Sequence, residues 1–179
     1  MLELTIPEQE LFNEATEEFL YIDAKTIKLE HSLVSISKWE SKWGKPFLGK
    51  ESKTREETID YIRCMTITQN VDPMVYRGIT NENIVEVSNY IESPMTATWF
   101  NEEQKKTNRD VVTSELIYYW MVALNIPMEC QKWHLNRLLT LIRICNIKNE
   151  KPKKMSKNTI LSRNSALNAA RRKRMKTKG

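Results

Sequence analysis

The chain has 179 residues, of which only four are Gly and six are Pro, and its 28 Lys and Arg outnumber 23 Asp and Glu to give a formal net charge of +5. This length suits one domain, with or without a tail, and the scarcity of glycine disfavours sandwiches or barrels that need many tight turns. Neither glycine-rich phosphate-binding motif, G-x-G-x-x-G or G-x-x-x-x-G-K, occurs, which argues against a nucleotide-binding loop.

The N-terminal residues and the cysteines indicate a reducing compartment without membrane contact. Residues 1–12, MLELTIPEQELF, lack the basic start and apolar core of a secretory signal. Polar residues interrupt every apolar stretch before it reaches the length of a membrane span. Cys64, Cys130 and Cys145 form no close pair, so we expect free thiols in apolar helices. We therefore expect a cytoplasmic protein without a cofactor.

The first 32 residues are predicted to form an acidic, extended segment packed on a helical domain. Residues 2–6, LELTI, alternate apolar and polar side chains before Pro7, as a short edge strand does. Residues 19–22 and 27–33 are either two further extended segments or irregular. The first 23 residues hold seven acids and no Lys or Arg.

Two helices with clear boundaries are predicted next. Ser32 or Ser35 caps a helix that runs to Trp43, and Gly44 provides its stop. Thr54 and Glu57 form a T-x-x-E capping box that begins the second helix. The apolar stripe of the first helix is spaced three and four residues apart and also includes a carboxylate: Leu33, Ile36, Trp39, Glu40 and Trp43.

Three more helices complete the expected domain. After a linker or short turn, VDPMVYRGIT, Thr80 caps a third helix that ends at Pro94, and a polar loop follows at 101–109. Thr107 or Asn108 begins a fourth helix through Leu124, whose run LIYYWMVAL is apolar nearly all round and should therefore be central. The fifth runs from Pro127 or Met128 to Cys145 with a leucine-rich stripe. The sequence thus predicts a mainly α fold, a compact bundle of about five helices over 33–147.

Residues 148–179 form a basic tail that carries twelve Lys or Arg and one acid, Glu150. Since the whole chain carries +5, the remaining body is acidic. Ser156 can cap a last helix to about Arg174, which has few apolar side chains and should be marginal without a partner. Three interpretations of the tail stay open: docking on an acidic protein surface, including a second copy; nucleic-acid contact through phosphates; and a solvated tail. With no aromatic residue in the tail, base stacking is excluded, and nucleic acid is the less favoured partner.

The candidate partner-binding residues fall into two groups. Trp39 and Trp43 share a helical face and form a stacking platform, a protein-binding groove or part of the core. The cationic candidates all lie in the tail: Lys153, Lys154, Arg171, Arg172, Lys173 and Arg174.

No catalytic constellation or metal site is predicted. Cys130 and His134 are four residues apart, which suits a dyad or half of a zinc site. No local spacing supplies an oxyanion hole, an orienting group or further ligands. We expect no enzyme activity.

Seven runs of residues carry a resemblance that covers most of the chain after residue 33: SISKWESKWGKPFL at 35–48, TIDYIRCMTIT at 58–68, MTATWF at 95–100, SELIYYWMVALNIP at 114–127, ECQKWHLNRLLTLIRICN at 129–146, KKMS at 153–156 and LNAARRKRMKTKG at 167–179. Together they resemble small proteins from the tail-gene blocks of long-tailed (siphovirus-type) bacteriophages, in particular the tail assembly chaperones.

This resemblance implies a non-enzymatic function in virion morphogenesis. A tail assembly chaperone holds the apolar helices of a tape-measure protein before tail tube subunits polymerise around them. Such binding needs an exposed apolar surface and reversible contacts. The run Tyr118–Leu124, the Trp39/Trp43 face and the adaptable methionines either form that surface or fill a core. The alternatives are a structural virion component, such as a tail or connector subunit, and a nucleic-acid-binding protein.

Overall fold

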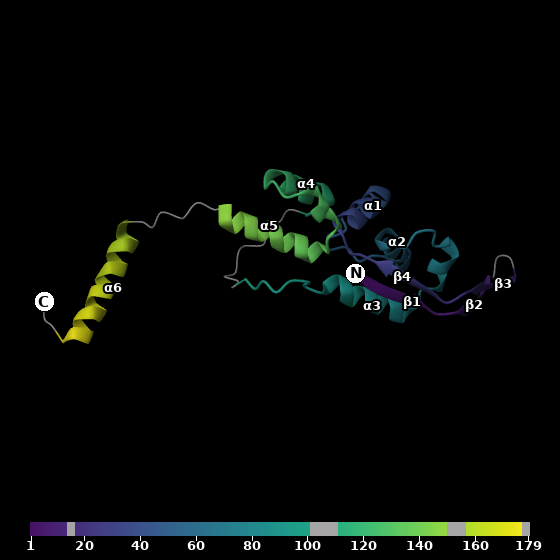
Figure 1. Cartoon of the computed structure of the whole chain (residues 1–179), viewed down its shortest axis with the longest axis horizontal. Helices are drawn as coiled ribbons and strands as arrows, with labels where there is room; N and C mark the ends of the chain where they lie inside the picture. Colours follow the sequence, from purple (N-terminus) through teal and green to yellow (C-terminus); the bar gives the residue numbers. More distant parts are fainter. Residues whose placement is uncertain (14–16, 101–110, 150–156, 177–179) are drawn as a thin grey trace. The chain divides into compact units, whose positions relative to one another are not determined.

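The computed structural model describes residues 1–13, 17–100, 111–149 and 157–176. The chain divides into two compact units, Met1–Ile147 and Lys148–Gly179 (Figure 1). In the first unit, short helices pack around the base of a β-ribbon, and the second unit contains a single described helix.

A long β-ribbon begins the first unit. Strand β1 (Leu2–Ile6) pairs antiparallel with β4 (Lys25–Leu29), and β2 (Gln9–Asn13) pairs antiparallel with β3 (Glu18–Ile22). Both ladders follow one register, because the pairing that sets Leu2 opposite Leu29 continues in step to set Gln9 opposite Ile22. The expected strand at 2–6 is confirmed, whereas β2 was not predicted.

The base of the ribbon lies inside the hydrophobic core. The inward side chains of β1 and β4 are fully buried, as the alternation of LELTI predicts: Leu4, Ile6, Ile27 and Leu29. Neighbouring segments cover both edges of this base. The backbone N–H of Ile67 donates to the Lys28 carbonyl (2.8 Å), and the Asn83 side-chain amide donates to the Thr5 carbonyl (3.0 Å).

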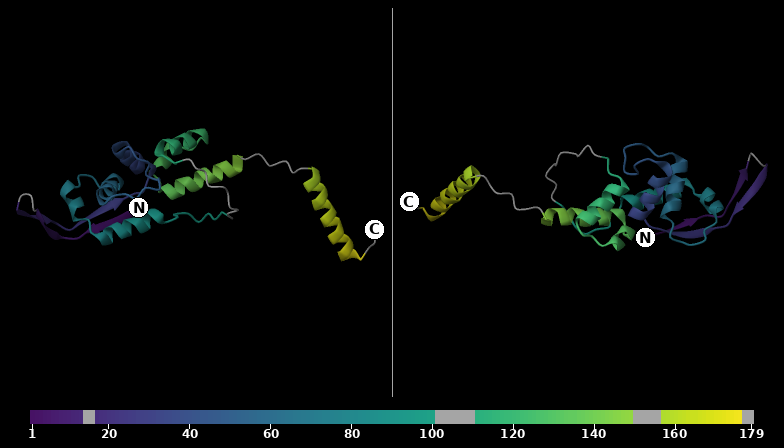
Figure 2. Two further views of the ribbon diagram at one scale, coloured as in Figure 1. Left: turned by 180° about the vertical axis from the view of Figure 1, so that it is seen from behind. Right: turned by 90° about the horizontal axis from the view of Figure 1, so that it is seen from above.

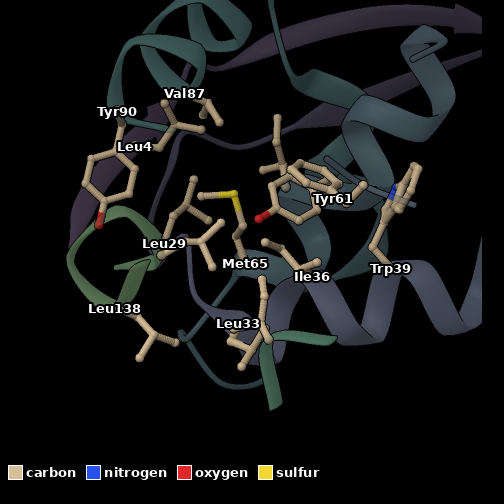
Figure 3. Close-up of a cluster of buried hydrophobic side chains, with 14 of the residues drawn as sticks. Leu4, Leu29, Leu33, Ile36, Trp39, Tyr61, Met65, Val87, Tyr90 and Leu138 are labelled. Atoms are coloured by element: carbon tan, nitrogen blue, oxygen red, sulfur yellow. The ribbon is translucent and has the colours of Figure 1, made fainter. Parts of the chain in front are cut away.

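This placement overturns the predicted fold class. The expectation of a mainly α, compact bundle of about five helices with a small N-terminal β element is wrong: the fold is mixed α/β, although predominantly helical, with two small two-stranded sheets in the described residues. The physical reason is that the strands supply fully buried side chains to the same cluster as the helices. In Figure 3, Leu4 and Leu29 from the ribbon lie beside Met65 and Val87 from the helices.

The predicted boundaries of the first helix and the predicted start of the second are confirmed. Helix α1 (Leu33–Trp43) begins at the Ser32 cap and ends at Gly44, whose left-handed backbone (φ 62°) lets its N–H bond the Glu40 carbonyl. Helix α2 (Arg55–Met65) begins with the predicted Thr54–Glu57 capping box. The two helices pack against each other, and Trp39 of α1 and Tyr61 of α2 are buried in the core.

The segment between α2 and the next helix is more ordered than a linker. It contains a 3₁₀-helix, η1 (Pro73–Gly78), which Asp72 caps. Helix α3 (Asn81–Glu92) then begins at the predicted Thr80 cap and packs on β1. Gly78 lies against the ribbon, so closely that a Cβ added there would come within 2.7 Å of Gln9 Nε2.

The fourth and fifth helices begin later than predicted. Helix α4 (Ser114–Ala123) starts after the Thr113 cap, and the expected loop at 101–109, with the proposed start at Thr107 or Asn108, lies outside the described residues. Residues 128–132 form a 3₁₀-helix, η2 (Met128–Lys132), and α5 (Leu135–Asn149) follows it. The expectation that α4 is central is also wrong, because only one side of this helix is buried.

The second unit contains helix α6 (Lys157–Met175), whose described residues are all exposed. The predicted Ser156 cap lies outside the described residues. No helix in the described ranges is long and apolar enough to cross a membrane.

Candidate protein-binding site

The outer face of α4 exposes apolar side chains on an ordered helix. Tyr119 and Val122 are three residues apart, so they are neighbours on the helix surface, and they are 65% and 67% exposed. The opposite face is anchored in the core by Ile117 and Met121, both fully buried. One face of the helix formed by LIYYWMVAL therefore packs in the core, and the opposite face exposes a rigid apolar patch. We call this patch, formed by Tyr119 and Val122, the α4 patch.

The N-terminal end of α4 is fixed by a buried carboxylate on α1. Glu40 accepts the backbone N–H of Ser114 at 2.8 Å through one oxygen, and that of Phe47 at 2.7 Å through the other. The carboxylate thus accepts a hydrogen bond from an N–H in the first turn of α4 that has no partner within the helix. Its negative charge also interacts favourably with the positive N-terminal end of the α4 dipole. This contact explains why a charged residue occurs in the apolar stripe of α1, and it fixes the helix that carries the patch.

A second apolar surface lies on the outer half of the ribbon, the tip hairpin (β2 and β3), which extends away from the rest of the first unit in Figure 2. Phe12 and Phe19 are direct cross-strand partners with ring centroids 5.1 Å apart, and both are exposed. Tyr21 lies on the same face at 78% exposure, opposite Glu10. A hydrogen bond and the negative charge of Glu10 raise the pKa of Tyr21, so the phenol stays neutral.

The tryptophan pair from the sequence falls mainly inside the core. Trp39 is only 1% exposed, and its indole N–H donates to the Glu57 carbonyl at 2.9 Å. Trp43 is half-buried and donates to Asp60 Oδ2 at 2.9 Å, while Lys42 also contacts Asp60. Only Trp43 thus presents part of its ring at the surface.

The cationic candidates separate by position. Arg171, Arg172, Lys173 and Arg174 all lie in the last turns of α6 and are exposed. Lys153 and Lys154 lie outside the described residues. Within α6, six Lys or Arg occur without any acid.

The two histidines meet in the interior, which the sequence did not indicate. His31 and His134 have ring centroids 5.1 Å apart, and Ser32 and His134 form an isolated antiparallel bridge. His31 Nδ1 lies 2.5 Å from the Tyr61 hydroxyl, and His134 Nε2 lies 3.1 Å from the Tyr90 carbonyl. Burial lowers the pKa of both rings, that of His31 to about 3, so both are neutral at physiological pH.

These contacts assign the histidines a structural position. Both imidazole rings have polar partners, and the Tyr90 hydroxyl in turn donates a hydrogen bond to Glu30 at 2.6 Å. Burial also raises the pKa of Tyr61 and of Tyr90. Across the residues that the structure describes, no group of three or more His, Cys, Asp or Glu is arranged to hold a metal ion.

Comparison with known proteins gave no match to a family model, to a curated protein or to a solved structure.

The sequence left the run Tyr118–Leu124 open between a binding surface and a core, and it missed the tip hairpin. The run is apolar all round its helix, and β2 was not recognised because QELFN is a short, weakly alternating run. The pair of aromatic residues is the feature that indicates the hairpin, because the polar run NEATEE separates Phe12 from Phe19 in the sequence and the two are cross-strand partners.

Proposed function

We propose that this chain is a non-enzymatic protein-binding factor that holds apolar helices of a client, and that it acts as a phage tail assembly chaperone in the host cell cytoplasm. The observation that carries the proposal is the α4 patch: Tyr119 and Val122 are exposed on a helix whose other face is locked into the core. The resemblance of the sequence suggests the clients, which would be the tape-measure protein and the tail tube subunit.

The chemistry of the patch suits this function. Exposing a neighbouring aromatic and β-branched pair does not stabilise a monomer. Covering the pair with an apolar helix is favourable by about 25 cal/mol for each Å² of apolar surface removed from water. A patch of two large side chains gives modest affinity, which permits release when the tail polymerises. The anchoring of α4 by Glu40 keeps the patch rigid, so little ordering entropy is lost on binding.

The experiment is co-expression with the tape-measure protein encoded nearest this gene, with the soluble fraction of that protein as the readout. We expect Tyr119→Glu with Val122→Glu to abolish the solubilisation given by the wild type. The matched control is Val85→Glu, because Val85 is a comparably exposed apolar residue on α3. Equal solubilisation by wild type and the double variant would contradict the proposal.

Two other functions are separated by further measurements. A structural tail or connector subunit would be found by mass spectrometry in purified mature particles, whereas a chaperone should be absent from them. A nucleic-acid-binding function is favoured by one observation, the exposure of all six α6 cations. It predicts duplex binding whose affinity falls steeply with salt.

A further inference from the structure

We propose that α6 of one copy docks on the aromatic face of the tip hairpin of a second copy, so that the chain self-associates. This inference does not depend on the proposed function, because it uses neither the α4 patch nor a client. It rests on three features: the composition of the hairpin, the composition of α6, and the position of the hairpin in the first unit.

The hairpin presents an aromatic surface bordered by acids. Phe12, Phe19 and Tyr21 are all more than half exposed on one face of the two strands. Residues 8–23 contain six Asp or Glu and no Lys or Arg. Such a surface attracts a cationic partner and buries apolar side chains once the partner is seated.

Helix α6 has the complementary composition. Its apolar side chains are all exposed, and three of them, Ile160, Leu167 and Met175, recur seven and eight residues apart and thus lie near one stripe. Arg171 lies on the same stripe and Arg174 beside it, and cations over aromatic rings add attraction. An α-helix of 19 residues is about 28 Å long, enough to cross two five-residue strands of about 17 Å.

The occupant is a second copy because of where the hairpin lies. Helix α5, at whose end the chain leaves the first unit, and the tip hairpin lie at opposite ends of that unit in every view (Figures 1 and 2). A helix of the same copy would have to return along the whole unit to reach the hairpin. A second copy can present its helix directly, and the contact is either reciprocal, which closes a dimer, or repeated from copy to copy.

The test is sedimentation velocity of the full chain, treated with nuclease and checked by its absorbance ratio for nucleic acid. Two charge-reversed variants are compared with wild type: a hairpin variant (Glu8→Lys, Glu10→Lys) and a helix variant (Arg171→Glu, Arg172→Glu, Arg174→Glu). All five positions are exposed, so both variants should stay folded. The matched control reverses two exposed acids on α3, Glu82→Lys and Glu86→Lys.

We expect wild type and control to associate, and added salt to weaken their association. Each reversed variant alone should be mainly monomeric, with its association constant lowered by roughly tenfold or more. An equimolar mixture of the two reversed variants should associate again as mixed species, because the native hairpin of one meets the native helix of the other. A wild type that stays monomeric at low salt would overturn the proposal. A larger species that is present before nuclease treatment and absent after it would also overturn the proposal. So would unchanged association of both reversed variants.

Discussion

His31 and His134 pack edge to face, 5.1 Å between ring centroids, and the backbone N–H of Leu135, the next residue, donates to the His31 carbonyl at 2.7 Å. This pair joins the end of the ribbon to the start of α5. Tyr61 from α2 and Tyr90 from α3 bond to the same two residues, so four elements converge on one neutral polar cluster.

The histidine pair should make stability depend on pH. The unfolded chain binds a proton at each histidine with the ordinary pKa of about 6.5, whereas burial and the neighbouring His134 lower the pKa of folded His31 to about 3. Between these values the unfolded state binds more protons. The free energy of unfolding should therefore fall as pH is lowered from about 6.5 toward 3, by at most about 1.4 kcal/mol per pH unit for this residue.

His31→Asn tests this origin, since Asn keeps a polar atom near the Tyr61 hydroxyl but does not titrate. Urea unfolding of wild type and variant is compared between about pH 7.5 and about pH 4.5, a range that spans the titration of an ordinary histidine. The free energy of unfolding should fall less steeply with decreasing pH for the variant. Identical slopes would mean that His31 does not titrate differently in the folded state.

Glu40 should be more important to stability than its place in an apolar stripe suggests. Glu40→Gln replaces one carboxylate oxygen by an amide nitrogen, which leaves the N–H of Phe47 or of Ser114 without its acceptor. We expect a loss of about 1–3 kcal/mol in the free energy of unfolding. Glu86→Gln, on the exposed face of α3, is the control and should change it by less than about 0.5 kcal/mol. Equal effects would show that the bridge to α4 contributes nothing.

Gly78→Ala should destabilise the first unit by overpacking. The added methyl would meet the Gln9 side chain at 2.7 Å and the methyl groups of Ile6 and Ile22 at 3.1 and 3.2 Å. Since the isoleucines are anchored in the ribbon, we expect a cost of about 1–3 kcal/mol. Thermal unfolding measures it, with the exposed Ser41→Ala on α1 as a neutral comparison. An unchanged midpoint would show that the ribbon moves freely relative to η1.

The two tryptophans should behave differently when each is replaced by Phe. Trp39→Phe leaves the buried Glu57 carbonyl without its indole donor and should cost about 1–3 kcal/mol. Trp43→Phe loses a bond to Asp60 that Lys42 also contacts near solvent, so it should cost less. Chemical denaturation followed by circular dichroism compares them. A larger loss for Trp43→Phe would reverse this assignment of core and surface.

Local features of the sequence predicted the starts of α1, α2 and α3, whereas α4 and α5 begin later than predicted. Ser32, Thr54 and Thr80 each begin a helix, and Gly44 ends one, because caps depend on a few neighbouring backbone groups. The α6 helix and its exposed cations follow in the same way from composition, since a segment with few apolar side chains has little to bury.

Tertiary structure alone decided which apolar residues are inside. Helix α4 is apolar on both faces, and only the packing of Ile117 and Met121 against the core determines that Tyr119 and Val122 remain exposed. The strand pattern of the ribbon likewise does not show which part of it other elements cover, so its buried base and exposed tip depend on packing. Short-range patterns fix helix ends because capping is local, whereas burial and the meeting of His31 with His134 depend on contacts between distant segments.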